Sequence, residues 1–365
     1  MLFFNTLSFL YLRYFMIVLI ALSSFMVGFD LMEYAAELPR SANLVLIYII
    51  YKLFYAVDMM LPISLVFAMI ASLVEMVRSN AMVAYYAIGY SKYRVFFPFL
   101  AVSTLIMGLY IALHTTSFAR ANEYANNLRE SSELIRPTSN LFFTHEGNYI
   151  YFGNLYPLMR KAEDIRIFTF TDGNFSQVLS AKSAVYSDGY WVIPKAHIVH
   201  SPRTLDLKGA GIMIDNRDNI KVLPDFRPKI LDQVYEGKVN FAIGDGLEAL
   251  RLLEKQNVDV AKIKSALYRM FFSPWFALIL MVIFFSYAPV SGRFFNLSLF
   301  SFGAILVTLL SWGVLFMMGE LSVNKTLSPE VGVIAPIVLL MSIMSLRLSR
   351  FKIKSRQNKT SKANP

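Results

Sequence analysis

Long apolar stretches on either side of a polar middle section dominate the distribution of hydrophobic residues along the chain. A helix needs about 20 largely apolar residues to cross a bilayer, because each residue rises ~1.5 Å and the hydrocarbon layer is ~30 Å thick. Six stretches come close to this length and predict three membrane-spanning helices before the middle section and three after it. They are 14–29, 59–73, 95–113, 270–288, 297–318 and 331–346. The aromatic-rich residues 2–11 predict a short interfacial helix before the first span.

The middle section alternates between short β-branched or aromatic runs and turn signals, a pattern typical of antiparallel strands. Asp172-Gly173-Asn174 and Asp188-Gly189 are two of these turn signals. A polar helical stretch at 119–134 precedes the runs, and an amphipathic helix at 245–253 follows them. The strand-like runs are 149–152, 165–170, 184–187, 191–194, 197–200, 211–214 and 220–223.

These patterns predict an α-helical membrane protein with six transmembrane helices and an inserted extracytoplasmic, antiparallel β-jellyroll-like domain. We expect four segments along the chain. They are an N-terminal membrane half (1–118), a β-domain with flanking helices (119–263), a C-terminal membrane half (264–349) and a basic tail (350–365).

Composition supports this division. Of 365 residues, 56% are hydrophobic and 16% are charged, and the mean hydropathy is +0.49. Soluble domains have a charged fraction of about 25%, so most of this chain does not face water. Residues 119–263 hold 18 Lys/Arg and 18 Asp/Glu, so the two apolar flanks carry the whole net charge of +10.

The positions of Lys and Arg in the short loops predict the orientation, because positive residues are retained on the cytoplasmic side. If six spans alternate, one side carries 12 basic residues and a single acid, Glu75. Both termini are therefore expected in the cytoplasm, and the β-domain outside it. We interpret the basic tail as a topology signal attracted to anionic lipid.

The chain lacks the residues of common catalytic and metal sites. It has no Cys, its four His residues form no ligand motif, and it contains neither a phosphate-binding loop nor a nucleophile elbow. We therefore expect a non-catalytic protein with no cofactor and no metal. Among the few charges near the spans, Lys52 and Asp58 are interpreted as interfacial, and no proton relay across several spans is visible.

The segment between the second and third spans, residues 75–94, is too polar to continue the membrane and too long for a tight turn. Ala81, Met82, Tyr85 and Tyr86 fall on one face at helical spacing, and Gly89 is well placed to end the helix. This aromatic and methionine face can dock in a groove on a soluble partner, or it can lie flat on the lipid surface. Spacing alone leaves both interpretations open.

Several short motifs occur in an order that resembles one known family. The first span ends in Phe29-Asp30-Leu31-Met32-Glu33, and Met60-Leu61-Pro62 precedes the second. Ala87-Ile88-Gly89-Tyr90-Ser91 is similar to the end of the family's coupling helix, placed here at about 78–90. Leu247-Glu248-Ala249-Leu250 resembles the helix after its β-jellyroll, and Tyr268-Arg269 through Pro274 resembles the entry to the fourth span. The family is that of the lipopolysaccharide export permeases LptF and LptG (YjgP/YjgQ).

The resemblance implies one permease subunit of an ABC exporter in the bacterial inner membrane. Its partners would be a second, similar permease, a cytoplasmic ABC ATPase dimer and LptC- and LptA-like bridge proteins, with no nucleic acid involved. Lipopolysaccharide would leave the membrane through a lateral opening lined by the first and fifth spans and pass along the β-jellyroll to the bridge.

Two positions depart from the family pattern. An acidic residue commonly contacts the ATPase from the coupling helix, and Ala81 stands at that position here, so a more apolar contact is expected. Lysines that meet lipid A phosphates near the outer end of the first span are also missing. Arg40, Arg120 and Arg129 are the candidate replacements. The dipeptide Phe29-Asp30 and the acidic stretch after it resemble LptG more than LptF.

Two other functions remain open at this point. A membrane-anchored scaffold or sensor would use the β-domain to bind an extracytoplasmic partner and would transport nothing. A secondary transporter would need polar sites at the membrane midplane and repeated halves, and the sequence shows no internal repeat.

Overall fold

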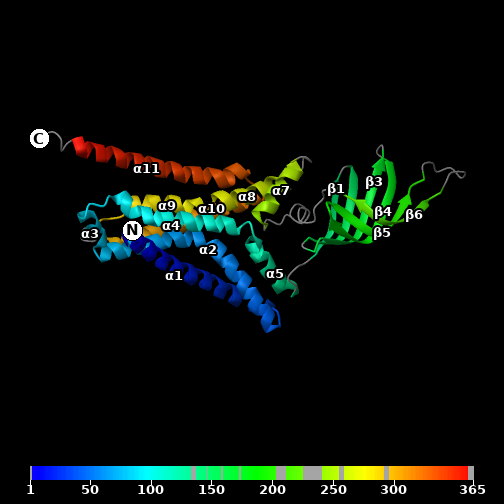
Figure 1. The fold of residues 1–365 in the computed structure, drawn as a ribbon, viewed down its shortest axis with the longest axis horizontal. Helices are drawn as coiled ribbons and strands as arrows, with labels where there is room; N and C mark the ends of the chain where they lie inside the picture. The colour runs from blue at the N-terminus through cyan, green and yellow to red at the C-terminus, as the bar shows by residue number, and fades with distance from the viewer. Residues whose placement is uncertain are drawn as a thin grey trace. The chain divides into compact units, whose positions relative to one another are not determined.

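The computed structural model describes residues 2–132, 137–145, 147–157, 159–171, 174–202, 211–224, 241–254, 259–291 and 296–360. The chain forms two compact units (Figure 1). The helical unit combines Met1–Ala125 with Leu253–Pro365, and the β-unit comprises Asn126–Leu252.

Six helices among the described residues are long and apolar enough to cross a membrane, which confirms the six predicted spans. They are α1 (Leu2–Glu33), α2 (Ala42–Arg78), α4 (Lys92–Leu113), α8 with α9 (Ala261–Phe272 and Trp275–Tyr287), α10 (Leu297–Val323) and η4 with the start of α11 (Glu330–Ile334 and Ala335–Thr360). Shorter elements lie between them: η1 (Ala35–Glu37), α3 (Ala81–Ala87), η2 (Ser117–Arg120), α5 (Ala121–Ser131) and α7 (Ile243–Glu254).

Two sequence-based boundaries are wrong. Residues 2–11 form the first turns of α1 and no separate interfacial helix, because nothing between them and the first span breaks a helix. The second span begins at Ala42, well before residue 59, and Lys52 and Asp58 lie inside α2. The sequence marks both charges as interruptions, whereas in the fold each has a partner on a neighbouring element.

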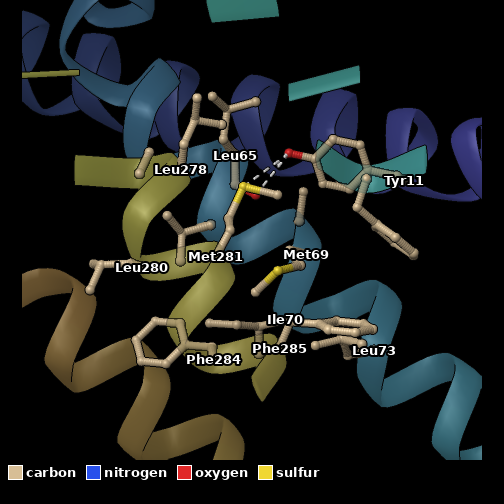
Figure 2. Close-up of a cluster of buried hydrophobic side chains, with 14 of the residues drawn as sticks. Tyr11, Leu65, Met69, Ile70, Leu73, Leu278, Leu280, Met281, Phe284 and Phe285 are labelled. Carbon is tan, nitrogen blue, oxygen red and sulfur yellow. Dashed lines mark hydrogen bonds between the residues drawn. The ribbon is translucent and has the colours of Figure 1, made fainter. Parts of the chain in front are cut away.

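The core of the helical unit forms where α1, α2, α4 and α9 meet (Figure 2). Met69 and Leu73 of α2 face Met281 and Phe285 of α9, all of them buried. The hydroxyl of Tyr11 on α1 is also inside this core. It donates to the carbonyl oxygen of Leu65 at 3.0 Å and accepts from Ser103 at 2.7 Å, so one buried group links α1, α2 and α4.

The β-unit is a six-stranded antiparallel sheet in which each strand pairs with its neighbours in sequence, which confirms an inserted antiparallel β-domain. Its strands are β1 (Thr138–His145), β2 (Asn148–Tyr156), β3 (Lys161–Thr171), β4 (Asn174–Ser187), β5 (Tyr190–His200) and β6 (Met213–Val222). The strand order is that of a meander. The predicted runs 191–194 and 197–200 belong to one strand, β5, the runs 211–214 and 220–223 both overlap β6, and β1 was missed.

A crease that crosses the sheet explains this splitting. The buried side chains of β5 are Trp191 and Ile193 and then Ala196 and Ile198, so the alternation changes phase within the strand. In β1 to β4 the alternation of buried and exposed side chains also changes phase, at residues that lie opposite one another across the sheet. On both sides of this row the strands keep the same pairing register. Left-handed backbone conformations accompany it at Asn140 in β1, Asp164 in β3 and Asn219 in β6. Each half of such a strand has its own regular alternation, so the sequence pattern predicts two short strands in place of one.

Gly153 of β2 lies opposite Asp164 in this row, where an added Cβ would come within 2.8 Å of the Cβ of Asp164. Gly153→Ala is therefore expected to destabilise the sheet by roughly 1–3 kcal/mol. Amide hydrogen exchange of the full chain should show faster exchange in β2 and β3. Gly211→Ala is the matched control, since nothing lies within 4 Å of its Cβ position. Equal exchange in the two variants would contradict the close packing at the crease.

Candidate functional site

The helix α3 lies at the end of the helical unit where α1 begins (Figure 1). Asn80, with a φ of 57°, turns the chain out of α2 into α3. Gly89 ends the helix with a φ of +95°, as expected for a position that favours glycine. The amide of Gly89 donates to Tyr86 O at 3.0 Å and that of Tyr90 to Tyr85 O at 3.1 Å, a Schellman motif. Both ends of this short helix are thus sharply defined.

The face of α3 that was expected to dock with a partner points into the chain itself. Met82 is fully buried, and Ala81, Tyr85 and Tyr86 pack half-buried against the same core. The ring of Phe3 at the start of α1 packs edge-on against Tyr85. This face of α3 therefore packs against the chain itself, because α1 extends far enough towards its N-terminus to cover it.

The opposite face of α3 is exposed and apolar. Its members are Val83, Ala84, Ala87 and Ile88, which we call the outer face of α3. Ile88 is 73% exposed and Val83 40%. Burial raises the pKa of Tyr86, and its hydroxyl has no hydrogen-bond partner among the described residues. A partner that contacts α3 from outside the chain therefore meets small and aliphatic side chains.

A buried ion pair joins α1 to α2 towards the other end of these helices. Lys52 Nζ lies 2.9 Å from Asp30 Oδ1, with side-chain exposures of 7% and 18%. Tyr48 also donates to Asp30, and Lys52 donates to Asn122 at 3.3 Å. Lys52 thereby holds α1, α2 and the start of α5 at one point.

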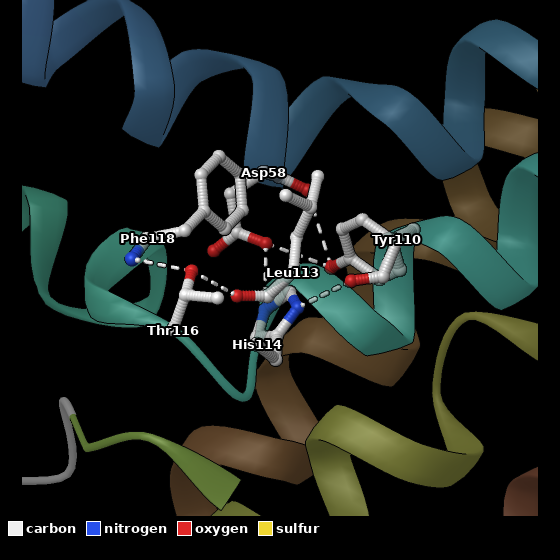
Figure 3. A network of polar contacts seen from close by, with 6 residues as sticks. All are labelled: Asp58, Tyr110, Leu113, His114, Thr116 and Phe118. Atoms are coloured by element: carbon white, nitrogen blue, oxygen red, sulfur yellow. Dashed lines mark hydrogen bonds and ion pairs between the residues drawn. The ribbon is translucent and has the colours of Figure 1, made fainter.

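A second polar cluster joins α2 to α4 (Figure 3). Asp58 Oδ1 accepts from the hydroxyl of Tyr110 at 2.8 Å and lies 3.0 Å from His114 Nε2. His114 Nδ1 lies 3.0 Å from the carbonyl oxygen of Tyr110, so both ring nitrogens face acceptors and the protonated ring fits best. The carbonyl of Asp58 also accepts from Tyr110, at 3.4 Å, because Pro62 has no N–H to bond with it.

The C-terminal helices are joined in the same way. Arg269 of α8 lies 2.5 Å from Glu320 of α10, and Ser265 lies 2.7 Å from Ser322. Beyond the helix ends Lys325 pairs with Asp259, and this hydrogen bond holds the pKa of Asp259 below its usual value. Among the described residues, no group of three or more His, Asp or Glu could hold a metal ion.

The three arginines considered as contacts for lipid phosphate lie in different surroundings. Arg40 is exposed in the turn before α2, and Arg120 in η2 is buried within the helical unit. Arg129 of α5 belongs to the β-unit and lies 3.7 Å from Glu130. Of the two in the helical unit, only Arg40 is accessible to a ligand from outside.

Six apolar helices in one unit, with an antiparallel sheet inserted in the sequence between the third and the fourth, define a multi-pass membrane protein with an inserted β-domain. The family model of the lipopolysaccharide export system permease LptF/LptG matches residues 7–350, and the chain belongs to this family. The family covers both LptF and LptG. A search of curated protein sequences found no match to the chain. The chain is thus a lipopolysaccharide export permease of the inner membrane.

Proposed function

We propose that this chain is one permease subunit of an ABC exporter, paired with a second permease of the same family and with two copies of a cytoplasmic ATPase. The family match over residues 7–350 carries this proposal. The chain would extract lipopolysaccharide from the inner membrane and pass it along its β-unit to LptC- and LptA-like bridge proteins. In this orientation both termini and α3 face the cytoplasm, and the β-unit faces the periplasm.

The outer face of α3 supports the coupling step. The short helix α3 exposes Val83 and Ile88, and this apolar surface is left uncovered by the described residues. Docking on an ATPase would bury it and gain roughly 25 cal/mol per Å². Met82 and Tyr85 pack α3 against the core that also contains residues of α1 and α4. A movement of the docked ATPase would therefore be transmitted through α3 to these two helices.

The first and fifth spans support the extraction step. Only a narrow stripe of α1 is buried, formed by Leu7, Tyr11, Phe15, Ser23 and Val27. In α10 the apolar side chains of Leu299, Phe302 and Leu310 are likewise exposed. Lipid A needs a continuous apolar path, since each CH₂ left in water costs about 0.8 kcal/mol. The exposed apolar faces of α1 and α10 could line such a path and contact a second permease.

The interior of the β-unit is the proposed continuation of the path. Its inner face is lined by apolar side chains such as Ile150, Phe152 and Trp191, which are fully buried against one another. Acyl chains could enter only if this packing opened. We propose that the crease, where the inward residues include the small side chains Ala162 and Ala184, is where the sheet flexes.

Depletion of the chain tests this function against the scaffold alternative. An exporter subunit predicts that lipopolysaccharide accumulates at the inner membrane and is lost from the cell surface when the chain is depleted. It also predicts that an ABC ATPase and a second permease co-purify with the full chain. Intact surface lipopolysaccharide after depletion, with no ATPase recovered, would favour the scaffold.

A further inference from the structure

A polar groove crosses the solvent-facing side of the β-unit at the crease, and we call it the crease groove. Its volume is about 570 Å³, and small-molecule sites typically enclose roughly 300–1,000 Å³. The groove is therefore large enough for an organic ligand of several linked units. Its lining spans four neighbouring strands and includes Asn154 of β2, Asp164 and Arg166 of β3, Lys182 and Ser183 of β4, and His197 of β5.

The lining offers many hydrogen-bonding groups but no net charge. The carboxylates of Glu163 and Asp164 are balanced by the cations of Arg166 and Lys182. Glu163 accepts from Lys161 at 2.6 Å, and Arg166 Nη2 lies 3.3 Å from Asp164 Oδ2. Arg166 and Asp164 stay 52% and 54% exposed, so both remain accessible to a ligand. An anion would meet the two carboxylates and a cation the two basic groups, so an uncharged polar ligand fits best.

Three polar groups of the lining make no hydrogen bond to any other described residue. They are Nζ of Lys182, the hydroxyl of Ser183 and the amide nitrogen of Asn154, whose Oδ1 accepts from Ser139 at 2.9 Å. The groove thus presents free donors beside the acceptor oxygens of its carboxylates. A ligand that is rich in hydroxyl groups would match both, because each hydroxyl donates and accepts.

An exposed aromatic patch adjoins the groove on the same face of the sheet. Tyr149 is 40% exposed, and its ring centroid lies 5.8 Å from that of Phe142 and 5.3 Å from that of Phe170. Phe168 lies opposite Tyr149 in the register. It is two residues from Arg166 on β3, so the two side chains share a face and their Cα atoms are ~7 Å apart. One ligand can therefore contact both the aromatic patch and the crease groove.

We propose that the crease groove binds an uncharged glycan chain, with one sugar ring on Tyr149 and hydroxyl groups of the next on Arg166 and Lys182. The C–H face of a sugar ring is apolar and slightly positive, and it suits the negative face of an aromatic ring. Its hydroxyl groups match the mixed donors and acceptors of the groove. An acyl chain would use the aromatic patch alone, and a phosphate would approach two carboxylates.

The proposal rests on the periplasmic placement of the β-unit in the proposed function, and it does not require transport. Two glycans are then within reach, the core sugars of the exported lipopolysaccharide and the backbone of the cell wall. If glycan binding fails while ATP-dependent release of lipopolysaccharide persists, this proposal alone is wrong and the proposed function stands.

Saturation-transfer NMR on the full chain tests the site. The chain would be placed in phosphatidylcholine nanodiscs free of sugar-headed detergents, which would compete for the groove. Chitotetraose represents the cell-wall backbone, and lipid-free core oligosaccharide represents the exported lipid. We expect saturable binding of at least one of them, and the tighter of the two identifies the source of the glycan.

Three variants assign this binding to the groove. Lys182→Gln should weaken it roughly tenfold, the loss expected for one charge-assisted hydrogen bond. Tyr149→Leu should weaken it roughly fivefold by removing the stacked ring. Lys221→Gln removes an exposed cation of β6 that lies over Tyr190 outside the groove, and it should bind like the unchanged chain.

The result that would overturn the proposal is equally specific. Neither glycan would bind in a saturable manner, or binding would be unchanged in both Lys182→Gln and Tyr149→Leu. Inorganic phosphate or tetraglycine that bound more tightly than both glycans would also overturn it, because the groove would then select an anion or a peptide.

Discussion

Ile88→Asp is expected to abolish recovery of the ATPase with the permease and to stop lipopolysaccharide export with it. Ile88 is 73% exposed on the outer face of α3, so a charged side chain at this position would not disrupt the packed core. At a docked interface the new carboxylate would be desolvated without a partner, and a central contact of this kind contributes 2 kcal/mol or more. Binding should weaken at least roughly 30-fold, measured by co-purification of the ATPase with the tagged chain.

Three companion variants separate docking from folding. Val83→Asp, on the same outer face, should lose the ATPase as well. Ile88→Leu keeps the apolar surface and should retain it. Met82→Asp introduces a charge into the core and should instead reduce the amount of folded chain. If Ile88→Asp and Val83→Asp both retained the ATPase at the level of the unchanged chain, α3 would not be the coupling element.

The second large effect is expected at the ion pair between α1 and α2. Asp30→Asn would leave Lys52 charged and 7% exposed without its carboxylate, and breaking a buried pair in this way costs roughly 3–5 kcal/mol. The hydrogen bond from Tyr48 would also lose its charged acceptor. Thermal unfolding of the purified chain in detergent should show a clear fall in the midpoint temperature.

Removing both charges is the matched control. The double variant Asp30→Leu, Lys52→Met buries two apolar side chains and should recover most of the lost stability, because no charge is then left unpaired. Arg40→Gln, at an exposed site in the turn before α2, should change the midpoint little. A double variant as unstable as Asp30→Asn would show that the pair is not the source of the loss.

The helical part of the fold follows from the sequence because a membrane span has a strong, local signal. Five of the six predicted stretches lie within a candidate span of the structure, and the sixth, 270–288, crosses the break between α8 and α9 and ends one residue beyond α9. The sequence did not predict the full extent of α2, because Lys52 and Asp58 interrupt its apolar pattern. Their partners Asp30 and His114 lie on other elements, and no spacing along one helix reveals such pairs.

The candidate site shows the same division between local and long-range information. The capping signal of Gly89 is local, and the end of α3 was placed correctly from it. Which face of α3 points outwards depends on where Phe3 packs, a contact across more than 80 residues. An apolar face at helical spacing is equally consistent with a docking surface and with a core, and here it is core.

The β-unit was only partly predictable for a different reason. The alternation of β5 is regular on either side of the crease, but it changes phase between Ile193 and Ala196. A period-two pattern then divides one strand into two. Strand β1 carries alternating Leu141 and Phe143, but the polar Thr138 to Asn140 obscure its start.

Reconstitution of the complete complex tests the central claim most directly. The chain, its second permease and the ATPase would be placed in proteoliposomes that contain lipopolysaccharide, and release to a soluble bridge protein would be measured with and without ATP. We expect release that requires ATP, is lost in Ile88→Asp and is retained in Ile88→Leu. An intact complex that hydrolyses ATP but releases no lipopolysaccharide, or releases it equally without ATP, would contradict the role of this chain as an export permease.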